Sequence, residues 1–446
     1  MATLNLPSKL VERPEPIDVG IIGAGLFGTN LIDQIERVPG MRSALVADID
    51  TGKASRTLAN AGVDDVTVAD DVSEANAAMD AGRRAVVADG SVAAASTVDV
   101  VVEATGVPDI GARHAYEAIT SGKHVVMVTV EADTVVGPTL TRLAENNGVT
   151  YTMAYGDQPS FCVELCDWAR SVGLDIVAVG KGNAYTTENR RGTPDDIFDR
   201  LGFSDEFVEA NGLNPRMFNS FFDGTKVAVE MCAVANALGF EPDVPGMHIP
   251  TAEIPEIPEK LRPEEDGGLL SGTGVVDTIS TVYDDGSTVD HGIGFGMFIV
   301  TSTPTARIQN YLRQYAGDGL YVANDGEYQV FYRPFHLPGI ETPVSIANAA
   351  IRNEATGAVR HQHTEVVGAA KRDLRAGTEL DGGGGTTVYG HLVTAARAER
   401  EGYVPFELLD GGTLRNDVGT DEVVTYDDVD LDEGFLHSLR QIQAAT

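Results

Sequence analysis

The sequence is poor in lysine, cysteine and tryptophan, and it contains no long uninterrupted apolar run. Its three cysteines, Cys162, Cys166 and Cys232, are too few for a disulfide framework, which excludes a small disulfide-stabilised scaffold. No run approaches the roughly 18 apolar residues that would predict a transmembrane helix. The first residues also lack the basic and apolar regions of a secretory signal. We therefore expect a cytoplasmic protein that does not act at a membrane.

The scarcity of lysine accompanies a strong excess of acid. Seven of the 32 basic residues are lysines, whereas 67 residues are acidic and the formal net charge is −35. The electrostatic field of this negative net charge repels nucleic acid and anionic membranes, so neither is expected as a partner. The acids are dispersed along the chain, a pattern that we interpret as a halophilic surface, since high salt screens the repulsion to a few ångströms. Because lysine is so rare, we expect the remaining lysines to have local roles.

Strands and helices alternate over the first third of the sequence. Apolar runs at 17–22 and 98–106 are each followed by a helical pattern, and a further apolar run lies at 84–89, which predicts a doubly wound parallel sheet of the Rossmann type over residues 1–156. After residue 156 the pattern changes, and 157–362 is expected to form an α+β domain that carries the substrate site. Short β segments with turns predict a small, mainly-β domain over 363–446.

The motif GAGLFG lies directly between the first strand and an amphipathic helix. Gly23 permits a tight turn, Gly25 lets the backbone approach a pyrophosphate, and Gly28 allows the helix to pack closely on the strand. Leu26 and Phe27 stand where the helix begins, and its free N–H groups would face the phosphate. The motif therefore predicts a dinucleotide site made of all five residues.

Two later segments extend this predicted site. Asp48 ends the second strand, where an acid binds the ribose hydroxyls and favours NAD. Lys53 and Arg56 follow closely and would suit the 2′-phosphate of NADP, so both cofactors remain open. In the stretch EATG, Thr105 and Gly106 end the strand beside the expected switch point and are predicted to contact the nicotinamide ribose.

Several unusual stretches are spread over nearly the whole chain. They are VTVEADTVVGP, YGDQPSFCVEL, VGKGNAY, FFDGTKVAVEM, ANALGFEPDVPGMH, YRPFHLP and AKRDLRAGTELDG. These stretches resemble the deoxyxylulose-phosphate-reductoisomerase-like (DRL) oxidoreductases. A resemblance to the cofactor domain of homoserine dehydrogenases is found in the segment VVVEATGVPDIGARHAYEAITSGKHVVMVTVEAD. The DRL resemblance implies a homoserine-dehydrogenase-type cofactor domain, a separate catalytic domain and a C-terminal SAF domain.

The resemblance implies an NAD(P)-dependent oxidoreductase that acts on a small polar keto or hydroxy substrate and forms a homo-oligomer. The family's named activity converts 1-deoxyxylulose 5-phosphate to methylerythritol 4-phosphate. The alternative is a homoserine-dehydrogenase-like hydroxy-acid dehydrogenase. Those enzymes follow their Gly-Lys-His-Val-Val strand with lysines, one of them catalytic, whereas this chain has Val130 and Glu131. A nucleotide-sensing protein without turnover is a third hypothesis.

Two lysines are the main candidates for catalysis. Reduction of a carbonyl needs a proton donor near the developing alkoxide, and a lysine in a partly dehydrated cleft can provide it. Lys181 lies between Gly180 and Gly182, just after a strand expected at 175–180, and the glycines would allow close approach of a ligand. Lys226 precedes a helix, and it matches a substrate-site lysine of homoserine dehydrogenases, which implies the same role here.

Three carboxylates complete the predicted catalytic site. Asp223 stands three residues before Lys226 and could orient it. Glu131 and Asp157 follow strands at the carboxyl edge of the first sheet, where they could act as a base, as lysine partners or as ligands of a divalent metal. The sequence does not establish whether a metal is required.

Two further features admit two interpretations each. Arg190 and Arg191 follow Lys181 on the expected loop and would suit a substrate phosphate, but a solvated loop edge explains them equally well. His336 in YRPFHLP is either a site residue or a buried hydrogen-bonding histidine.

Overall fold

The computed structural model describes residues 3–211, 213–317 and 319–445, which divide into two compact units. The first unit combines residues 3–164 with two later segments, 337–360 and 434–445. The second unit combines residues 165–336 with 361–433. The chain therefore contributes to each unit more than once.

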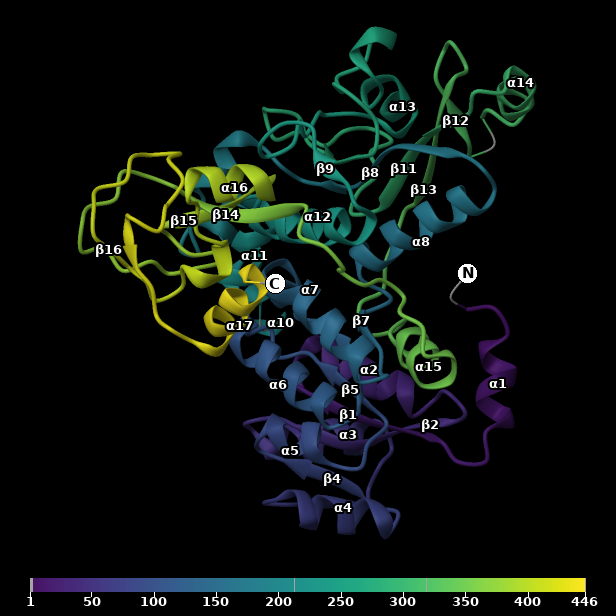
Figure 1. Cartoon of the computed structure of the whole chain (residues 1–446), viewed down its shortest axis with the longest axis vertical. Coiled ribbons are helices and arrows are strands. Elements are labelled where there is room, and N and C mark those ends of the chain that lie inside the picture. The colour runs from purple at the N-terminus through teal and green to yellow at the C-terminus, as the bar shows by residue number, and fades with distance from the viewer. Residues whose placement is uncertain (1–2, 212, 318, 446) are drawn as a thin grey trace. The chain divides into compact units, whose positions relative to one another are not determined.

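A seven-stranded parallel sheet forms the centre of the first unit (Figure 1), with the strand order β3-β4-β2-β1-β5-β6-β7. The strands are β1 (Ile17–Ile22), β2 (Met41–Ala47), β3 (Val66–Val68), β4 (Arg84–Val87), β5 (Val100–Glu103), β6 (His124–Met127) and β7 (Tyr151–Met153). The strand order reverses between β1 and β5, and doubly wound sheets bind their ligands at the carboxyl ends beside this switch point. The predicted Rossmann-type sheet is confirmed.

Helices cover both faces of this sheet. One layer contains α5, α6, α7 and α17, and the other contains α1, α2, α3 and α15. The helices of the unit are α1 (Leu6–Glu12), α2 (Leu26–Ile35), α3 (Thr51–Asn60), α4 (Val72–Asp80), α5 (Gly90–Ala95), α6 (Pro108–Thr120), α7 (Val130–Asn146), α15 (Pro343–Arg352) and α17 (Phe435–Ala444). Ile17, Val19 and Ile21 of β1 are fully buried. A strand buried on both faces explains the continuous apolar run in the sequence.

The C-terminal helix α17 supplies hydrogen bonds beside a proline inside α7. Pro138 lies inside α7, where a proline removes a backbone bond and crowds the preceding turn. Gln443 of α17 accepts hydrogen bonds from the N–H and the hydroxyl of Thr139, at 3.1 and 3.0 Å. Arg440 and Gln443 both donate to the carbonyl of Val135 at 3.0 Å. The end of the chain thus satisfies backbone groups that the proline would leave without partners.

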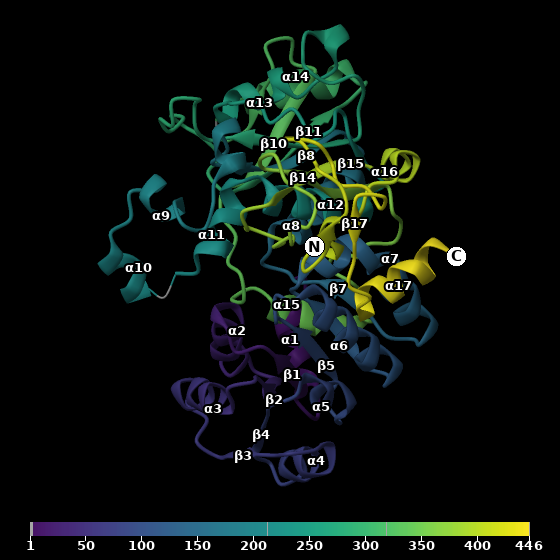
Figure 2. The same cartoon turned by 90° about the vertical axis from the view of Figure 1, so that its left-hand side faces the viewer.

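A six-stranded mixed sheet forms the centre of the second unit, in the order β12-β13-β11-β8-β10-β9. Its strands are β8 (Asp175–Asn183), β9 (Glu241–Pro242), β10 (Val275–Ser280), β11 (Met297–Ser302), β12 (Tyr321–Val322) and β13 (Tyr328–Arg333). The helices are α9 (Ile197–Arg200), α10 (Asp205–Asn211), α11 (Pro215–Phe222), α12 (Thr225–Leu238), α13 (Ile257–Lys260) and α14 (Ala306–Arg313), and α8 (Gln158–Ser171) leads into the unit from the first one. In Figure 2, α9 and α10 stand away from the strands of this sheet. The α+β prediction is confirmed.

Strand β8 extends beyond its expected end. The sequence predicted a strand over 175–180 followed by a loop, whereas β8 continues to Asn183. Lys181 therefore lies inside the strand, paired with Thr278 of β10 and Met297 of β11. The expected position of Lys181 on a loop was wrong, because pairing with strands on both sides continues past it.

The glycines beside Lys181 serve the packing of the sheet. A Cβ atom on Gly180 would collide with the carbonyl of Asp277, and one on Gly182 would collide with the carbonyl of Gly294. Neighbouring backbone already fills the space that a ligand was expected to approach. The sequence identified an important position here, but for a reason that the structure does not support.

The C-terminal domain of the second unit is built from short β segments. A hairpin of β14 (Thr364–Ala370) and β15 (Val388–Thr394) is followed by α16 (Ala395–Glu401) and by the small pair β16 (Thr413–Leu414) and β17 (Val429–Asp430). Helix α12 packs against both β14 and β15. The small, mainly-β domain that the sequence predicted is confirmed.

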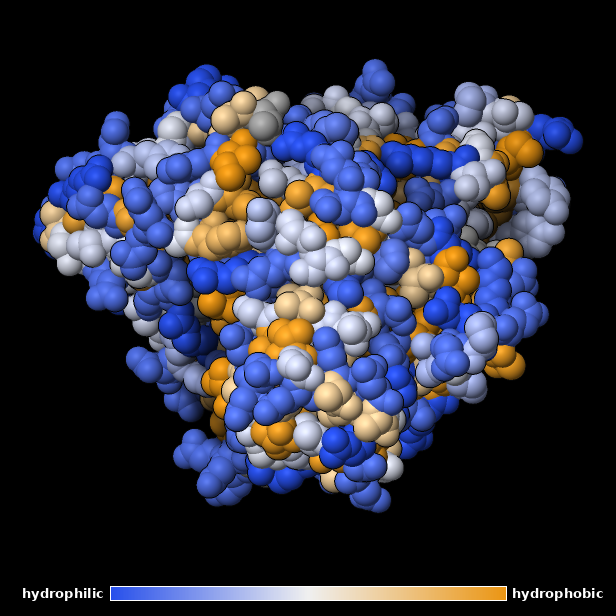
Figure 3. Space-filling model, turned by 60° about the horizontal axis from the view of Figure 1, so that its bottom comes forward, coloured by the Kyte–Doolittle hydropathy of each residue, from blue (hydrophilic) through white to orange (hydrophobic). Residues whose placement is uncertain are grey.

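One face of the molecule is mainly hydrophilic (Figure 3). On the face that Figure 3 shows, hydrophilic residues predominate and the apolar patches are scattered. Cys162, Cys166 and Cys232 form no disulfide bond with one another, and all three are buried. Among the described residues, no helix combines the length and the apolar character that crossing a membrane requires.

A buried acid on α7 makes the stability of the first unit sensitive to pH. Asp133 is completely buried, and the hydroxyl of Tyr151 donates to one of its oxygens at 2.6 Å. The other oxygen has no hydrogen-bond partner among the described residues. Burial raises the pKa of Asp133 from 3.8 to about 7; the hydrogen bond from Tyr151 opposes this rise, and the charge of Glu131 adds to it.

We expect Asp133→Asn to remove a pH dependence of stability. Between about pH 4 and pH 7 the folded chain retains a proton on Asp133 that the unfolded chain has released, so the free energy of unfolding falls as the pH rises through this window. The amide of the variant stays neutral at every pH. Above pH 7 its free energy of unfolding should therefore exceed that of the wild type by up to about 4 kcal/mol. Urea unfolding on both sides of this window measures the difference. Asp80→Asn, which changes an exposed aspartate, should follow the wild type, and a wild-type pH profile in Asp133→Asn would contradict this assignment.

Candidate active site

The glycine-rich loop joins β1 to α2 in the first unit. Gly23 adopts a φ of +103°, and a Cβ atom on Gly28 would collide with the carbonyl of Gly23, so only glycine lets the helix begin this close to the strand. A Cβ atom on Gly25 would meet nothing within 4 Å, which leaves this side of the loop open to a ligand. Phe27 packs against the core, while Leu26 is 78% exposed. The loop has the shape that a pyrophosphate requires.

Asp48 lies beside this loop at the end of β2. One of its oxygens accepts a hydrogen bond from the N–H of Ala24 at 2.8 Å, and the other accepts one from the N–H of Asp50 at 2.9 Å. Arg56, a candidate ligand for a 2′-phosphate, lies 3.7 Å from Asp50 in an exposed ion pair. The geometry fits a carboxylate held for ribose hydroxyls.

Glu103, which ends β5, organises the loop that follows. The hydroxyls of Thr105 and Thr129 each donate to a Glu103 oxygen at 2.5 Å, and the N–H of Gly106 donates to the Thr129 hydroxyl at 3.0 Å. The Nδ1 atom of His114 lies 3.6 Å from the same carboxylate. Glu103 therefore positions the predicted cofactor residues Thr105 and Gly106. Sequence reasoning did not single it out, although a charged residue at the end of the apolar run VDVVVE was a usable signal.

Glu131 and Asp157 lie at the ends of neighbouring strands. Glu131 is in the first turn of α7 after β6, and Asp157 follows β7, which pairs with β6. The carboxylate of Asp157 accepts a hydrogen bond from the N–H of Gln158 at 3.0 Å. Within the described ranges, no group of three or more His, Cys, Asp or Glu side chains is arranged to hold a metal. The chemical roles of both acids stay predictions.

Lys181 forms a buried ion pair in the second unit. Its Nζ atom donates to Oε2 of Glu230 on α12, and the two residues are only 3% and 2% exposed. His336 lies near this pair: burial lowers the pKa of its imidazole, the charge of Lys181 lowers it further, and Glu230 opposes the shift. Lys226 precedes Glu230 by one turn of α12, so the two side chains lie on the same helix face. The structure thus brings Lys181 to the helix that carries Lys226.

Sequence reasoning missed Glu230. It is the single charged residue between Val227 and Leu238, within an otherwise apolar stretch of the helix. A charge is rarely buried without a partner, so this position was a signal that a cation would be found opposite it.

Asp223 has a different partner from the one expected. The sequence suggested that it orients Lys226, whereas Nζ of Lys371 donates to its Oδ2 at 2.8 Å and the N–H of Thr225 donates to its Oδ1, also at 2.8 Å. Lys371 also donates to two backbone carbonyls, at 2.9 and 2.7 Å. All three donors of this buried ammonium group therefore have acceptors. The pair joins the C-terminal domain to the start of α12.

Arg190 and Arg191 contact other side chains rather than forming a pair that faces a common ligand. The guanidinium group of Arg190 lies over the rings of Tyr185 and Tyr389, at 5.6 and 5.5 Å from their centroids. Arg191 pairs with Asp421 at 3.0 Å. Since Tyr389 and Asp421 belong to the C-terminal domain, these arginines join that domain to the segment after β8.

Three protein-family models match successive parts of the chain. Residues 23–154 match the NAD-binding domain of homoserine dehydrogenase, 156–342 match the catalytic domain of oxidoreductase DRL, and 366–430 match the SAF domain. The chain thus carries a DRL catalytic domain between an NAD-binding domain of the homoserine dehydrogenase type and a SAF domain. The matches confirm the predicted resemblance and the predicted domain types, and the first domain is of an NAD-binding type.

Solved structures resemble the enzyme only in part, and no curated protein matches it. The WlbA dehydrogenase from Bordetella pertussis, solved with NADH and UDP-GlcNAcA, has 17% identity and a TM-score of 0.28 over 38% of this chain and 48% of its own. The 1-deoxy-D-xylulose 5-phosphate reductoisomerase from Zymomonas mobilis, solved with NADPH, has 17% identity and a TM-score of 0.31 over 48% of this chain and 60% of its own. A putative myo-inositol dehydrogenase from Sinorhizobium meliloti has 13% identity and a TM-score of 0.36 over 75% of this chain and 86% of its own. The chain spans about half the length of the first of these structures.

Proposed function

We propose that the enzyme interconverts a carbonyl and a hydroxyl group on a small polar substrate. The observation that carries this proposal is the buried Lys181–Glu230 pair within the part of the chain that matches the DRL catalytic domain. The nicotinamide cofactor, when bound, supplies or accepts the hydride. The protein must then supply a proton at the substrate oxygen during reduction and remove it during oxidation.

Lys181 is the group that we assign to this proton. Glu230 accepts a hydrogen bond from Nζ and so fixes the ammonium group, and burial of both residues strengthens their field by excluding water. Burial lowers the pKa of His336 and so disfavours its protonated form, and we therefore assign the proton to Lys181 rather than to this imidazole. Glu131 and Asp157 are proposed as additional acid–base or lysine-binding groups.

A phosphorylated keto sugar is the substrate class that we propose, with 1-deoxyxylulose 5-phosphate as the first candidate. Lys226 lies at the amino end of α12, where an ammonium group and the helix dipole both favour an anion. A homoserine-type substrate is less favoured, since Val130 and Glu131 stand where those dehydrogenases have lysines.

We further propose that residues 1–156 bind the cofactor, that 157–362 carry the substrate chemistry and the contacts of a homo-oligomer, and that 363–446 form the SAF domain and a C-terminal tail. The acidic composition leads us to propose that the enzyme works in a cytoplasm of high salt.

The test is a high-salt panel of keto-sugar phosphates and hydroxy acids with NADH, NADPH and their oxidised forms, followed by nicotinamide absorbance. Turnover of a keto-sugar phosphate is expected, and Lys226→Met should raise its KM by at least about tenfold, as loss of a charged contact does. Lys260→Met, which removes another helical lysine of the same unit, should change KM by less than twofold. Turnover of hydroxy acids alone would favour the dehydrogenase alternative. Cofactor binding without any turnover would favour a sensor.

For the cofactor we propose NAD, and Asp48→Asn tests it. The carboxylate of Asp48 beside the glycine loop would repel a 2′-phosphate, and contacts between like charges cost several kcal/mol. The amide should therefore shift the ratio of kcat/KM for NADPH over NADH upward by at least about tenfold. Asp64→Asn changes an exposed aspartate before β3 and should leave the ratio unchanged. A wild-type preference for NADPH would overturn the assignment of Asp48.

A further inference from the structure

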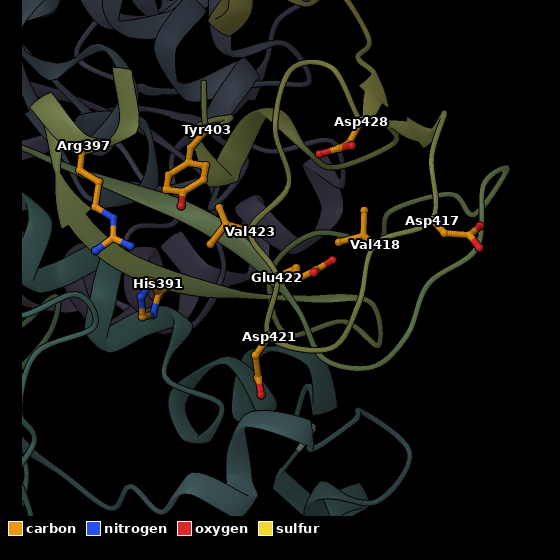
Figure 4. Close-up of a pocket in the computed structure, with 9 residues that line it drawn as sticks. All are labelled: His391, Arg397, Tyr403, Asp417, Val418, Asp421, Glu422, Val423 and Asp428. Atoms are coloured by element: carbon orange, nitrogen blue, oxygen red, sulfur yellow. The ribbon is translucent and has the colours of Figure 1, made fainter. Parts of the chain in front are cut away.

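A cavity of about 420 Å³ lies within the C-terminal domain of the second unit (Figure 4). His391 of β15, Arg397 of α16 and Tyr403 contribute one part of its lining, and the loop that contains Glu422 and Asp428 contributes another. This volume is within the range of sites that bind small molecules. None of the residues assigned to the oxidoreductase site lines the cavity.

Opposite charges line the cavity without closing on each other. Figure 4 shows Arg397, His391 and Tyr403 on one side and the carboxylates of Glu422 and Asp428 on the loop across from them. The Nε atom of Arg397 is buried and has no hydrogen-bond partner among the described residues. Arg397 lines the cavity, and no ion pair of its guanidinium group occurs among the described residues, so its positive charge favours an incoming anionic group.

The acids of the loop are held in place by their own backbone. Glu422 accepts a hydrogen bond from the N–H of Gly419 at 2.7 Å, and Asp428 accepts bonds from the N–H and the hydroxyl of Thr425 at 3.1 and 2.6 Å. Each carboxylate keeps further acceptor capacity, since it offers about four lone-pair sites. This side of the cavity favours a cationic group.

The histidine does not add a second positive charge. The pKa of His391 is lowered to about 4, first by burial and then by the charges of Arg190 and Arg397, while Asp421 opposes the shift. The cavity therefore presents one fixed cation, a neutral imidazole and the hydroxyl of Tyr403 to face the carboxylates.

We propose that this cavity binds a small zwitterion of the amino-acid class, with its carboxylate on Arg397 and its ammonium group on Glu422 and Asp428. A guanidinium group suits a carboxylate because its N–H groups form two parallel hydrogen bonds. A simple anion would face the acidic loop, and a simple cation would face Arg397. A zwitterion neutralises both sides at once.

The experiment is isothermal titration of the full-length enzyme, at high salt, with the proteinogenic L-amino acids one by one. At least one of them should bind. Its N-acetyl derivative, which lacks the ammonium group, and its methyl ester, which lacks the carboxylate, should bind about tenfold to a hundredfold more weakly, the range of a lost charge-assisted contact. Arg397→Gln should weaken binding by the same range. Arg400→Gln is the matched control, because Arg400 is exposed on the same helix and pairs with Glu401.

Three outcomes would overturn the proposal. The first is that no amino acid binds the wild type, whether or not a polyol such as myo-inositol does. The second is that the derivatives bind as well as the parent, and the third is an unchanged affinity in Arg397→Gln. If thermal unfolding shows that Arg397→Gln does not fold, the variant Glu422→Gln tests the proposal instead, because Glu422 is exposed. This variant should weaken binding at least about tenfold.

Discussion

Replacing Lys181 by methionine should lower kcat/KM by about 10²–10⁴-fold, the range that a positioned acid–base group contributes. Methionine keeps the unbranched apolar stem of the side chain and removes the proton. The affinity for the nicotinamide cofactor should stay within about twofold, because the residues that fit it belong to the glycine loop, the end of β2 and the loop after β5. Initial rates on the substrate found in the panel, together with a fluorescence titration of the cofactor, measure both quantities.

A loss of stability would also lower the activity of this variant, and its effect must be separated from the loss of the proton donor. Glu230 would be left as a buried charge without Lys181, and breaking such a pair costs about 3–5 kcal/mol of stability. The double variant Lys181→Met with Glu230→Gln removes both charges, and we expect it to recover most of the stability while it stays inactive. If activity returns with stability, the pair is structural and the proton donor lies elsewhere.

Replacing Lys371 by methionine should lower the free energy of unfolding by about 3–5 kcal/mol. Lys371 is 3% exposed, and its ammonium group reaches Asp223 and two backbone carbonyls. Burial already raises the pKa of Asp223, and Lys371 is the cation that opposes this rise. Without it the carboxylate is buried with no charge to balance it, and the contact between the C-terminal domain and the start of α12 weakens. Denaturant unfolding at high salt measures the loss.

The neighbouring residue provides the control for this effect. Arg372→Met removes an exposed cation from the adjacent position and should change stability by less than about 0.5 kcal/mol. Asp223→Asn combined with Lys371→Met leaves no buried charge and should cost less than the sum of the two single changes. Equal losses in Lys371→Met and Arg372→Met would show that the buried pair contributes nothing.

The parts of the enzyme that the sequence predicted well depend on short segments. The Rossmann sheet follows from apolar strands that alternate with amphipathic helices. The cofactor loop is one strand, one turn and one helix, so the steric roles of Gly23, Gly25 and Gly28 can be inferred from adjacent residues. Asp48 could be placed because it ends the strand next to β1.

The parts that the sequence missed or misplaced depend on distant pairs. Lys181 and Glu230 are 49 positions apart, Asp223 and Lys371 are 148 apart, and Thr139 and Gln443 are 304 apart. No local pattern tells which acid will face which lysine, since periodicity identifies a buried face but not the element that packs on it. Gly180 and Gly182 were misinterpreted for the same reason, because the backbone that requires them comes from Asp277 and Gly294.

The sequence by itself determined the classes of structure and chemistry: a nucleotide-binding sheet, an α+β catalytic domain, a small β domain, an acidic surface and a few lysines with local roles. Only the tertiary structure decided which charges meet. In the folded protein Lys181 forms an ion pair with Glu230, and Asp223 forms one with Lys371. Arg397 instead lines a cavity and forms no ion pair among the described residues. The physical reason is that steric patterns and helix periods act between near neighbours in the chain, whereas a buried charge is balanced by whatever folding brings within a few ångströms of it.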